Sequence, residues 1–402
     1  MNILFLNNAE ISPHSNGIQR VTHLISQGLM KEHDIKCYSA FFHHNNASPK
    51  SEFYGKLKIN KGKEIEQISE FISSNNIEVI ICQEIICSER VLFAIRDAVN
   101  EAGNCKLIYC FHSAPNHIFT KPDFSAKYYN AIHKIELKKS IRQFLISMVP
   151  SFLYTYFVKR QTKKKYALIN YIFDKIVLLS ESYITPYCLL SGIPDIAHQT
   201  KVVAIPNPLT FSQHLLPEKL SDKKKEIIIV SRLSERAKRI SLAFRIWKEI
   251  KRHNGLQNWK LTIVGTGEDE RYYKMLSKKM NLQDISFEGR QDPTIYYKRA
   301  SISIITSAYE GFPMNVLESL QMGVVPIIFD SFTSLHDFIE DKKNGIIVPN
   351  NNINQFVKDL AWIIQNEEKR DEIAIRGIND SYKFSIENIT KLWMSLFKTL
   401  KN

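Results

Sequence analysis

Short apolar runs alternate with amphipathic stretches along the chain. In the first half, five runs are rich in β-branched residues and almost continuously apolar, which is typical of strands buried on both faces of a parallel sheet. These runs are residues 2–7, 78–82, 106–111, 175–180 and 201–206. Helical spacing separates them, as where Val21, Ile25 and Leu29 share one face of a predicted helix.

The alternation stops and then restarts. Residues 206–225 contain proline, are polar and then strongly basic, and are typical of an interdomain linker. Six further apolar runs predict a second parallel sheet: residues 226–232, 259–265, 285–289, 301–306, 324–329 and 345–349. From about Ile353 we expect helices only. The fold class is therefore α/β, with two doubly wound, Rossmann-like domains facing a cleft.

The composition agrees with two globular domains. The chain has 402 residues, of which 44% are hydrophobic and 24% charged. Its six cysteines form no CxxC pair and no zinc-spaced set with histidine, which indicates reduced thiols in a cytosolic protein. Residues 1–10 lack the basic region and cleavage site of a signal peptide, so we expect them to begin the first strand.

The formal net charge of +13 is unevenly distributed. Residues 134–165 carry nine Lys or Arg against one acid, Glu136, and these cations bracket the apolar run 144–158. This arrangement favours contact with an anionic membrane surface over a nucleic-acid groove, so we expect no nucleic-acid partner. The alternative is a buried helical hairpin with solvated basic ends. The run is too short to span a bilayer, and Pro150 interrupts it.

Ligands of open parallel sheets bind beyond the carboxyl ends of the strands, so residues after each strand are the candidates for function. After the first strand, Gly17 opens a helix and would let backbone amides approach a phosphate or sugar. After residues 106–111, His112 could donate to a hydroxyl or phosphate oxygen. The alternatives are an ordinary loop glycine and a polar strand cap.

Two cations follow the first strand of the second half. Arg232 stands at the strand end, and Lys238 stands where the next helix starts. A guanidinium fork and an ammonium point charge suit a diphosphate, and the alternative is a solvated basic loop. Further along, Gly265 and Gly267 form an incomplete glycine motif, which more often marks a tight strand-to-helix turn than a dinucleotide site.

The loop after residues 301–306 leads into a predicted helix, with Pro313 as its first residue. Backbone amides at a helix N-terminus attract anions, and here they would belong to Met314, Asn315 and Val316. Glu310 and Glu318 flank this start. Each alone is more ordinary as a helix-start or solvated carboxylate. Together they would accept hydrogen bonds from sugar hydroxyls, so the predicted ligand is a sugar nucleotide.

At this point the chain resembles the family-4 glycosyltransferases, which are retaining enzymes of the GT-B fold. Glu310-Gly311-Phe312-Pro313 followed by Glu318 resembles the family's motif of two glutamates separated by seven residues. Residues 230–239 resemble its diphosphate loop, although Arg239 stands where glycine is common. Residues 17–20, 287–290, 323–329 and 344–349 also fit the places of family motifs.

The resemblance implies a role for each candidate. Arg232 and Lys238 would bind the donor diphosphate, Glu310 the transferred sugar and Glu318 the ribose, while His112 would lie near the reacting face of the sugar. The implied catalytic residues are Glu310, His112, Arg232 and Lys238. The implied donor-binding residues are Gly17, Arg232, Lys238, Glu310, Gly311, Phe312, Pro313, Met314, Asn315, Val316 and Glu318.

The resemblance also implies a domain plan. Residues 1–206 would bind the acceptor and carry a basic, aromatic insertion at about 121–171. Residues 207–384 would bind the donor. Residues 385–402, with Trp393, would form a helix that crosses back to the first domain.

The implied function is transfer of a sugar, with a UDP-sugar favoured as the nucleoside-diphosphate sugar donor, to a glycan or lipid-linked acceptor. The acceptor class would be lipopolysaccharide, capsule or another surface polysaccharide. The protein would be cytoplasmic and peripheral on the inner face of the cell membrane. The chain has no Asp-x-Asp triplet, so we expect neither a metal nor another cofactor.

Two other functions fit parts of this pattern. A sugar-nucleotide epimerase of the same fold would need further carboxylates and histidines in the first domain, where only His112 is clearly placed. A non-catalytic membrane- or polyanion-binding relative would be favoured by the loss of Glu310 or Lys238, and both are present.

Overall fold

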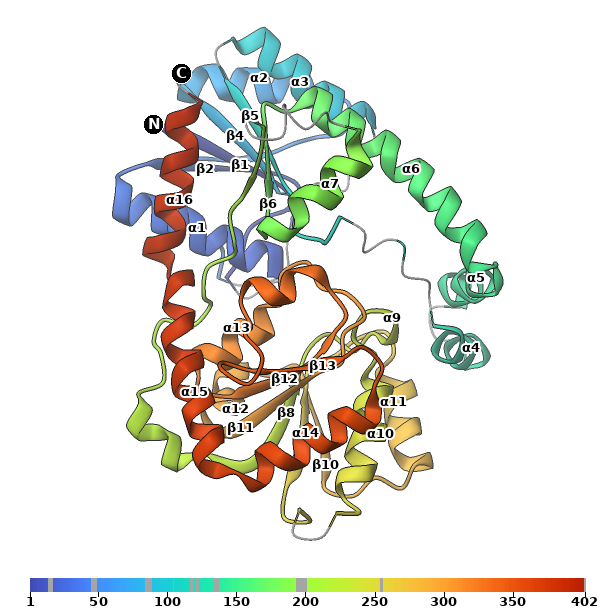
Figure 1. The fold of residues 1–402 in the computed structure, drawn as a ribbon. Coiled ribbons are helices and arrows are strands. Elements are labelled where there is room, and N and C mark those ends of the chain that lie inside the picture. Colours follow the sequence, from blue (N-terminus) through green and yellow to red (C-terminus); the bar gives the residue numbers. More distant parts are fainter. Residues whose placement is uncertain are drawn as a thin grey trace. The chain divides into compact units, whose positions relative to one another are not determined.

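A computed structural model describes residues 1–13, 17–44, 49–83, 89–103, 105–115, 119, 123–133, 137–192, 201–253 and 256–400. The chain divides into two compact units (Figure 1). Unit 1 contains Met1–Asn116, Lys159–Thr210 and Lys383–Asn402. Unit 2 contains His117–Val158 and Phe211–Tyr382.

Unit 1 is built on a seven-stranded sheet in the order β3-β2-β1-β4-β5-β6-β7, and every paired strand is parallel. This is the doubly wound order that the alternating pattern predicted. The strands are β1 (Asn2–Ala9), β2 (Lys36–His43), β3 (Lys56–Lys58), β4 (Val79–Gln83), β5 (Lys106–Cys110), β6 (Lys175–Leu178) and β7 (Val202–Ala204).

The helices of unit 1 include the last helix of the chain. They are α1 (Gly17–His33), α2 (Glu64–Asn75), α3 (Glu89–Ala102), the greater part of α6 (Ser151–Ile172), α7 (Ile184–Ser191) and α16 (Ile386–Thr399). Figure 1 shows α16 beside α1, and the two are in close contact because a Cβ on Gly28 would lie 2.6 Å from Ile386. Trp393 of α16 is buried.

Unit 2 is built on a six-stranded parallel sheet in the order β10-β9-β8-β11-β12-β13. Its strands are β8 (Lys224–Val230), β9 (Lys260–Val264), β10 (Ile285–Gly289), β11 (Ala300–Ile305), β12 (Val325–Asp330) and β13 (Ile346–Pro349). Each of the six predicted strands of the second half is confirmed. With the sheet of unit 1, this confirms the two doubly wound domains.

Helices cover this second sheet. They are α9 (Glu235–Lys238), α10 (Ile240–Ile250), α11 (Glu270–Lys279), α12 (Pro293–Arg299), α13 (Met314–Gln321), α14 (Ile353–Gln365) and α15 (Glu367–Ser381). On one face, Phe244 and Trp247 of α10 and Leu360 of α14 are fully buried in a core shared with the strands. Burial of each such side chain stabilises the fold by about 1.5–3 kcal/mol.

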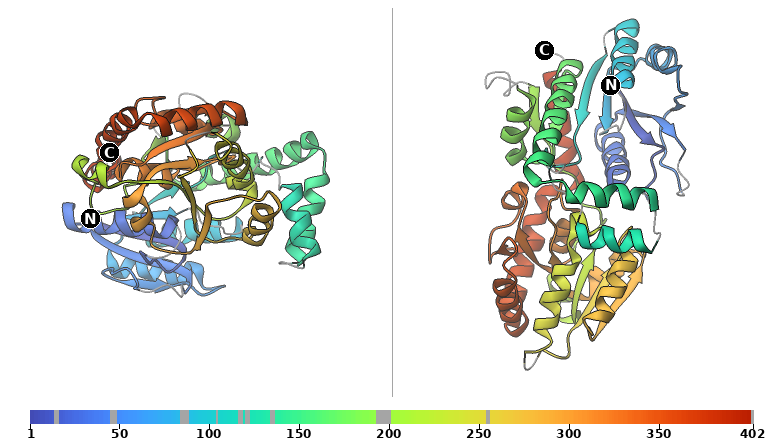
Figure 2. Two further views of the ribbon diagram at one scale, coloured as in Figure 1. Left: turned by 90° about the horizontal axis from the view of Figure 1, so that it is seen from below. Right: turned by 90° about the vertical axis from the view of Figure 1, so that its right-hand side faces the viewer.

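The insertion divides differently from the predicted domain plan. Helices α4 (Phe124–Ile132) and α5 (Leu137–Met148) lie side by side (Figure 2) and belong to unit 2, although residues 1–206 were predicted as one domain. Ala126 of α4 is fully buried in the core of unit 2. The predicted interruption at Pro150 is confirmed, because α5 ends just before it and α6 begins just after it. Residues 121 and 122, at the start of the predicted insertion, lie outside the described residues.

Two strands of unit 1 were not predicted. The run that forms β2 is interrupted by Tyr38 and Ser39 and contains no β-branched residue, so its apolar signal is weak. β3 is a three-residue edge strand with lysine at both ends. Pairing with β1 organises β2, and pairing with β2 organises β3, and neither pairing is visible in the local sequence.

Candidate active site

The loops at the carboxyl ends of the unit 2 strands form a connected group. The amide of Ala308, after β11, donates to the carbonyl of Ala237 in α9 at 2.7 Å. The Thr306 hydroxyl donates to the Lys238 carbonyl at 2.8 Å. The loop after β11 and the loop after β8 therefore lie against each other, as ligand-binding loops of such sheets do.

Lys238 and Glu310 are brought together at this edge. The Lys238 ammonium lies 2.5 Å from a Glu310 carboxylate oxygen, and the Ser307 hydroxyl donates to the same oxygen. The side chains of Lys238 and Glu310 are 19% and 11% exposed. An ion pair that is largely withdrawn from water is screened less than a surface pair, so it fixes both groups.

Arg239, the residue that replaces the family's common glycine, ties the same two loops together. Its φ of 47° is in the left-handed region, which glycine adopts at less cost. Its guanidinium donates to the carbonyls of Thr306 at 2.8 Å and Ser307 at 2.7 Å. It also donates to the Asn351 side chain at 2.8 Å. These bonds hold the backbone that carries Lys238 next to the loop that carries Glu310.

Arg232 lies in the loop after β8, and its side chain is 69% exposed. Its guanidinium is 3.5 Å from a carboxylate oxygen of Glu268, in the loop after β9. The guanidinium is thus accessible at the same strand edge as Lys238.

The two glycines after β9 allow close backbone approach to the Arg232 loop. A Cβ on Gly265, whose φ is 133°, would lie 2.0 Å from the Ser231 carbonyl oxygen. A Cβ on Gly267 would lie 2.3 Å from the Leu233 carbonyl oxygen. The incomplete glycine motif therefore marks a tight turn, as predicted, and it also shapes the loop that presents Arg232.

The helix after Glu310 begins at Met314, one residue later than predicted, with Pro313 as its N-cap. The Val316 amide donates to the Pro313 carbonyl at 2.9 Å, so in this conformation it is not available to an anion. The Asn315 side chain donates to the carbonyl of Val230 at the end of β8, at 3.3 Å. This bond holds the start of α13 beside the Arg232 loop.

The other residues of the glutamate motif, Gly311, Phe312 and Glu318, are partly or fully buried. Gly311 is partly buried, and Phe312 is 7% exposed and packs on Phe338 with ring centroids 5.6 Å apart. Glu318, just over one turn into α13, is 3% exposed. A carboxylate at such a depth needs polar partners, which excludes the solvated alternative for Glu318.

Gly17 and His112 lie in unit 1, whereas all other predicted site residues lie in unit 2. A ring nitrogen of His112 lies 2.5 Å from the Gln83 side-chain oxygen at the end of β4. His112 is partly buried, and desolvation lowers its pKa to about 4, so the imidazole is neutral near pH 7. Gly17 is exposed, and a Cβ there would meet no described atom within 4 Å.

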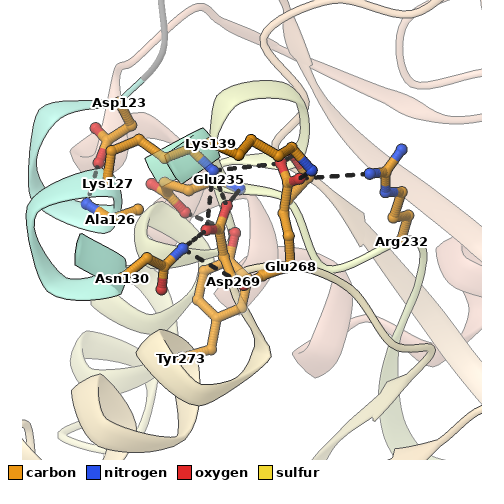
Figure 3. Close-up of polar contacts among 11 residues, drawn as sticks. Asp123, Ala126, Lys127, Asn130, Lys139, Arg232, Glu235, Glu268, Asp269 and Tyr273 are labelled. Carbon is orange, nitrogen blue, oxygen red and sulfur yellow. Dashed lines mark hydrogen bonds and ion pairs between the residues drawn. The ribbon is translucent and has the colours of Figure 1, made fainter. Parts of the chain in front are cut away.

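A charged network that joins the insertion to this site was not predicted. Figure 3 shows Lys127 of α4, Lys139 of α5 and Arg232 directed toward Glu268. The Lys127 ammonium is 3.3 Å from Glu268 and 3.1 Å from Asp269. The Lys139 ammonium is 3.0 Å from Glu268. Lys127 and Asp269 are 2% and 0% exposed, so this is a buried ion pair.

Asp269 connects α4 to the segment after β8. One of its oxygens accepts from the Asn130 side chain at 2.5 Å, and the other accepts from the amide of Glu235, the first residue of α9, at 2.8 Å. Burial raises the pKa of Glu235 to about 7, although Ser241 and Tyr273 donate to its carboxyl group. The insertion therefore belongs to the scaffold of the candidate site.

Comparison with known proteins gives one family match. Residues 213–380, nearly all of the main segment of unit 2, match the protein-family model described as "Glycosyl transferases group 1". An uncharacterized glycosyltransferase of Haemophilus influenzae is 29% identical over 227 residues, which are 56% of this chain and 61% of that protein. A lipopolysaccharide 1,6-galactosyltransferase of Salmonella typhimurium is 29% identical over 178 residues, which are 42% of this chain and 48% of that protein.

These alignments span about half to three fifths of the curated relatives. Among solved structures, the Anabaena protein HepE in complex with UDP is similar with a TM-score of 0.70 and 13% identity, covering 99% of this chain and 100% of that one. At this identity the similarity establishes the fold alone, which is GT-B.

Proposed function

This chain belongs to the group 1 glycosyltransferases through its residues 213–380, and we propose that it transfers a sugar, with retention of configuration, from a UDP-sugar to a glycan or glycolipid acceptor. The observation that carries the proposal is the Lys238–Glu310 pair at the strand edge of unit 2, beside the start of α13. A cation, a carboxylate and a helix N-terminus together match a diphosphate linked to a hydroxylated sugar.

Arg232 and Lys238 bind the diphosphate in this proposal. The guanidinium of Arg232 offers a planar fork, and the ammonium of Lys238 offers a point charge. Hydrogen bonds from Arg239 hold Lys238 in place. Negative charge on the diphosphate grows as the bond to the sugar breaks. The two cations therefore stabilise the transition state more than the bound donor.

Glu310 and Glu318 accept hydrogen bonds from hydroxyl groups. Glu310 already accepts from Ser307 and Lys238 on one carboxylate oxygen, and in this proposal a sugar hydroxyl replaces or joins these donors. Glu318, buried one turn further along α13, accepts from the ribose hydroxyls. A hydrogen bond to a charged group contributes about 1.5–3 kcal/mol.

The transfer step exchanges one bond at the anomeric carbon for another on the same face. The bond from that carbon to the β-phosphate oxygen breaks, and a bond to the acceptor hydroxyl oxygen forms. The proton of the acceptor hydroxyl passes to the leaving phosphate oxygen. Arg232, Lys238 and the N-terminal dipole of α13 offset the charge of the leaving group, so the mechanism calls for no metal ion.

His112 and Gly17 serve the acceptor side and the transferred sugar. Because burial lowers the pKa of His112, its imidazole acts as a neutral hydrogen-bonding group and not as a proton donor near pH 7. The open space at Gly17 suits close approach of a ligand to the first turn of α1.

The donor and acceptor classes are supported by the relatives. The Salmonella relative is named for galactosyl transfer to lipopolysaccharide, and the similar Anabaena structure contains UDP. We therefore propose a UDP-sugar as the donor and a lipopolysaccharide, capsule or other surface polysaccharide precursor as the acceptor.

A panel of nucleotide sugars tests the function. Uridine, guanosine and adenosine diphosphate sugars are compared for the rise in melting temperature, and ~100 Kd of a ligand should stabilise by about 2.7 kcal/mol. A labelled donor is then followed with and without cell-surface glycolipid. A new sugar nucleotide formed without acceptor would identify an epimerase, and binding with no product under either condition would favour the non-catalytic alternative.

The insertion supports membrane association in this proposal. Many large apolar side chains on α4, α5 and the start of α6 are exposed, contrary to the buried-hairpin alternative. We call this set the apolar face: Phe124, Tyr128, Ile132, Leu137, Ile141, Leu145, Met148, Phe152, Leu153, Tyr156 and Phe157. Exposed lysines follow it on α6 at positions 163–165. Among the described residues no helix is long and apolar enough to cross a membrane.

An apolar face beside basic residues suits the interface of an anionic bilayer, where each cation contributes about 1 kcal/mol. This would place the protein on the cytoplasmic face of the cell membrane. Replacement of Lys163, Lys164 and Lys165 with glutamine should weaken binding to phosphatidylglycerol vesicles, most at low salt. Binding equal to that of the parent would exclude this role for the basic residues.

A further inference from the structure

The insertion reaches the ion pair of Arg232 through Glu268. Its carboxylate receives Lys127 and Ser234 on one oxygen, at 3.3 and 3.2 Å, and Lys139 and Arg232 on the other, at 3.0 and 3.5 Å. Two of these partners come from the insertion, more than 125 residues away in sequence. Glu268 itself is 14% exposed.

Lys139 and Arg232 compete for the same carboxylate oxygen. Lys139 is the nearer of the two, and the contact of Arg232 is long for an ion pair. Without a cation from the insertion, Glu268 would keep a negative charge next to the guanidinium. Attraction between opposite charges would then draw Arg232 onto Glu268 and oppose its contact with an anionic ligand.

The balance of charge supports this reading of Figure 3. Among the residues that the structure describes, the ion-paired groups of the cluster are the carboxylates Glu268 and Asp269 and the cations Lys127, Lys139 and Arg232. One positive charge is in excess, and the most exposed cation is Arg232. Removal of Lys139 would make the cluster neutral.

The pKa of Glu268 shows how strongly the insertion acts on this carboxylate. Burial alone raises the pKa, but Lys127 and Lys139 lower it to about 2. Glu268 is therefore ionised throughout the physiological range, and its charge has to be balanced by cations at all times.

We propose that Lys139 is a positioning residue for donor binding: by occupying Glu268, it leaves Arg232 to the diphosphate of the donor. This inference rests on the proposed function and adds to it a role for the insertion. The insertion contributes to donor affinity from α5, although neither α4 nor α5 is part of the doubly wound fold. Lys127 acts on the same carboxylate and also anchors α4 through Asp269.

Lys139→Gln is the informative variant, because Lys139 is 48% exposed and its loss leaves no buried charge unpaired. Lys127→Gln would leave the buried carboxylate of Asp269 without its cation, which is strongly destabilising. A loss of folding would then obscure any effect of this substitution on UDP affinity. Lys138→Gln is the matched control, since it removes the same charge from the adjacent exposed position of α5.

The experiment measures UDP affinity by calorimetry, in solution and at low salt. The proteins compared are the parent, Lys139→Gln, Glu268→Gln, the double variant with both substitutions, and the control Lys138→Gln. Lys139→Gln should raise the Kd of UDP by about two- to fivefold, the size of one partly exposed ion pair. Lys138→Gln should leave the Kd within about 1.5-fold of the parent, because a solvated charge is screened. Glu268→Gln should bind UDP as well as the parent or more tightly.

The decisive comparison is Lys139→Gln in the Glu268→Gln background. If Lys139 acts by occupying Glu268, the second substitution should cancel the effect of the first, and the double variant should match Glu268→Gln. An unchanged Kd for Lys139→Gln, or a loss that persists in the double variant, would overturn the inference. A parent protein that binds no UDP would instead contradict the proposed donor, which separates the two failures.

Discussion

The two sheets share one strand order but present different chemistry at their carboxyl ends. In unit 2, Arg232, Lys238 and Glu310 lie on loops that hydrogen-bond to one another. In unit 1, the residue expected at the corresponding edge, His112, is held by Gln83 and kept neutral by burial. The same architecture therefore supports a charged, preorganised site in unit 2 and a neutral imidazole after β5 in unit 1.

This difference fits two kinds of ligand. A nucleoside diphosphate carries fixed negative charges in a fixed geometry, so a site for it needs cations held by rigid neighbours, such as Lys238 with Arg239. A neutral glycan acceptor makes no such demand. Substitutions in both units test whether the chemistry of the protein lies in unit 2, and the largest effects are expected there.

Lys238→Ala should cause the largest loss. Removing one group that stabilises developing charge lowers turnover by about 10²–10³-fold, while the Kd of UDP should rise much less. The measurement is kcat beside UDP affinity. Lys278→Ala, which removes an exposed lysine near the end of α11 in the same unit, is the control and should leave both values unchanged. A loss of affinity with unchanged kcat would contradict the assigned role.

Glu318→Ala should weaken donor binding by about 1.5–3 kcal/mol, because it removes a charged acceptor of ribose hydroxyls. This corresponds to a rise in Kd of about 10- to 150-fold. Glu318→Gln, which keeps the volume and one acceptor oxygen, should lose less. Uridine and deoxyuridine diphosphates compared on both variants would locate the contact, and equal affinity for the parent and Glu318→Ala would exclude it.

Arg239→Gly should lower turnover by about tenfold through misplacement of Lys238. Glycine adopts this positive φ without strain, so the substitution does not disturb the backbone conformation. Any loss of activity therefore comes from the lost hydrogen bonds of the guanidinium. Asn281→Gly, at a φ of 52° in the same unit, controls for strain relief alone and should retain full activity. An Arg239→Gly variant with normal turnover would show that the two loops keep their geometry without the guanidinium.

His112 should affect stability with a defined pH dependence. Its pKa is lowered from 6.5 to about 4 in the folded state, so between these values the unfolded chain binds a proton that the folded chain does not. The parent should therefore lose stability relative to His112→Asn as the pH falls, by about 1–2 kcal/mol between pH 7 and pH 5. Denaturant unfolding at several pH values measures the free energy of unfolding of both proteins. A difference between them that does not change with pH would contradict burial of a neutral imidazole.

The sequence predicted unit 2 better than unit 1 for a physical reason. Its strands are continuous apolar runs that need no partner to be recognised, whereas β2 and β3 become strands only by pairing with neighbours. The glutamate motif and the Arg232–Lys238 loop could also be predicted from the sequence, because each lies within about ten consecutive residues.

The missing part of the site is long-range. Lys127 and Asp269 are separated by 142 residues, and no local pattern distinguishes a lysine that will be buried from one that will be solvated. The same limit applies to Glu268, which reads as one acid in an acidic turn after an incomplete glycine motif. Its partners Lys127 and Lys139 belong to the insertion. The insertion packs on unit 2 through the burial of Ala126 and Lys127.

Hydrogen–deuterium exchange with and without saturating UDP tests the central claim most directly, since it locates the donor without a substitution. The account predicts the strongest protection in residues 231–239 and 307–318, which carry Arg232, Lys238, Glu310 and Glu318. Unchanged exchange in both segments, with UDP bound and protection elsewhere in the chain, would contradict it.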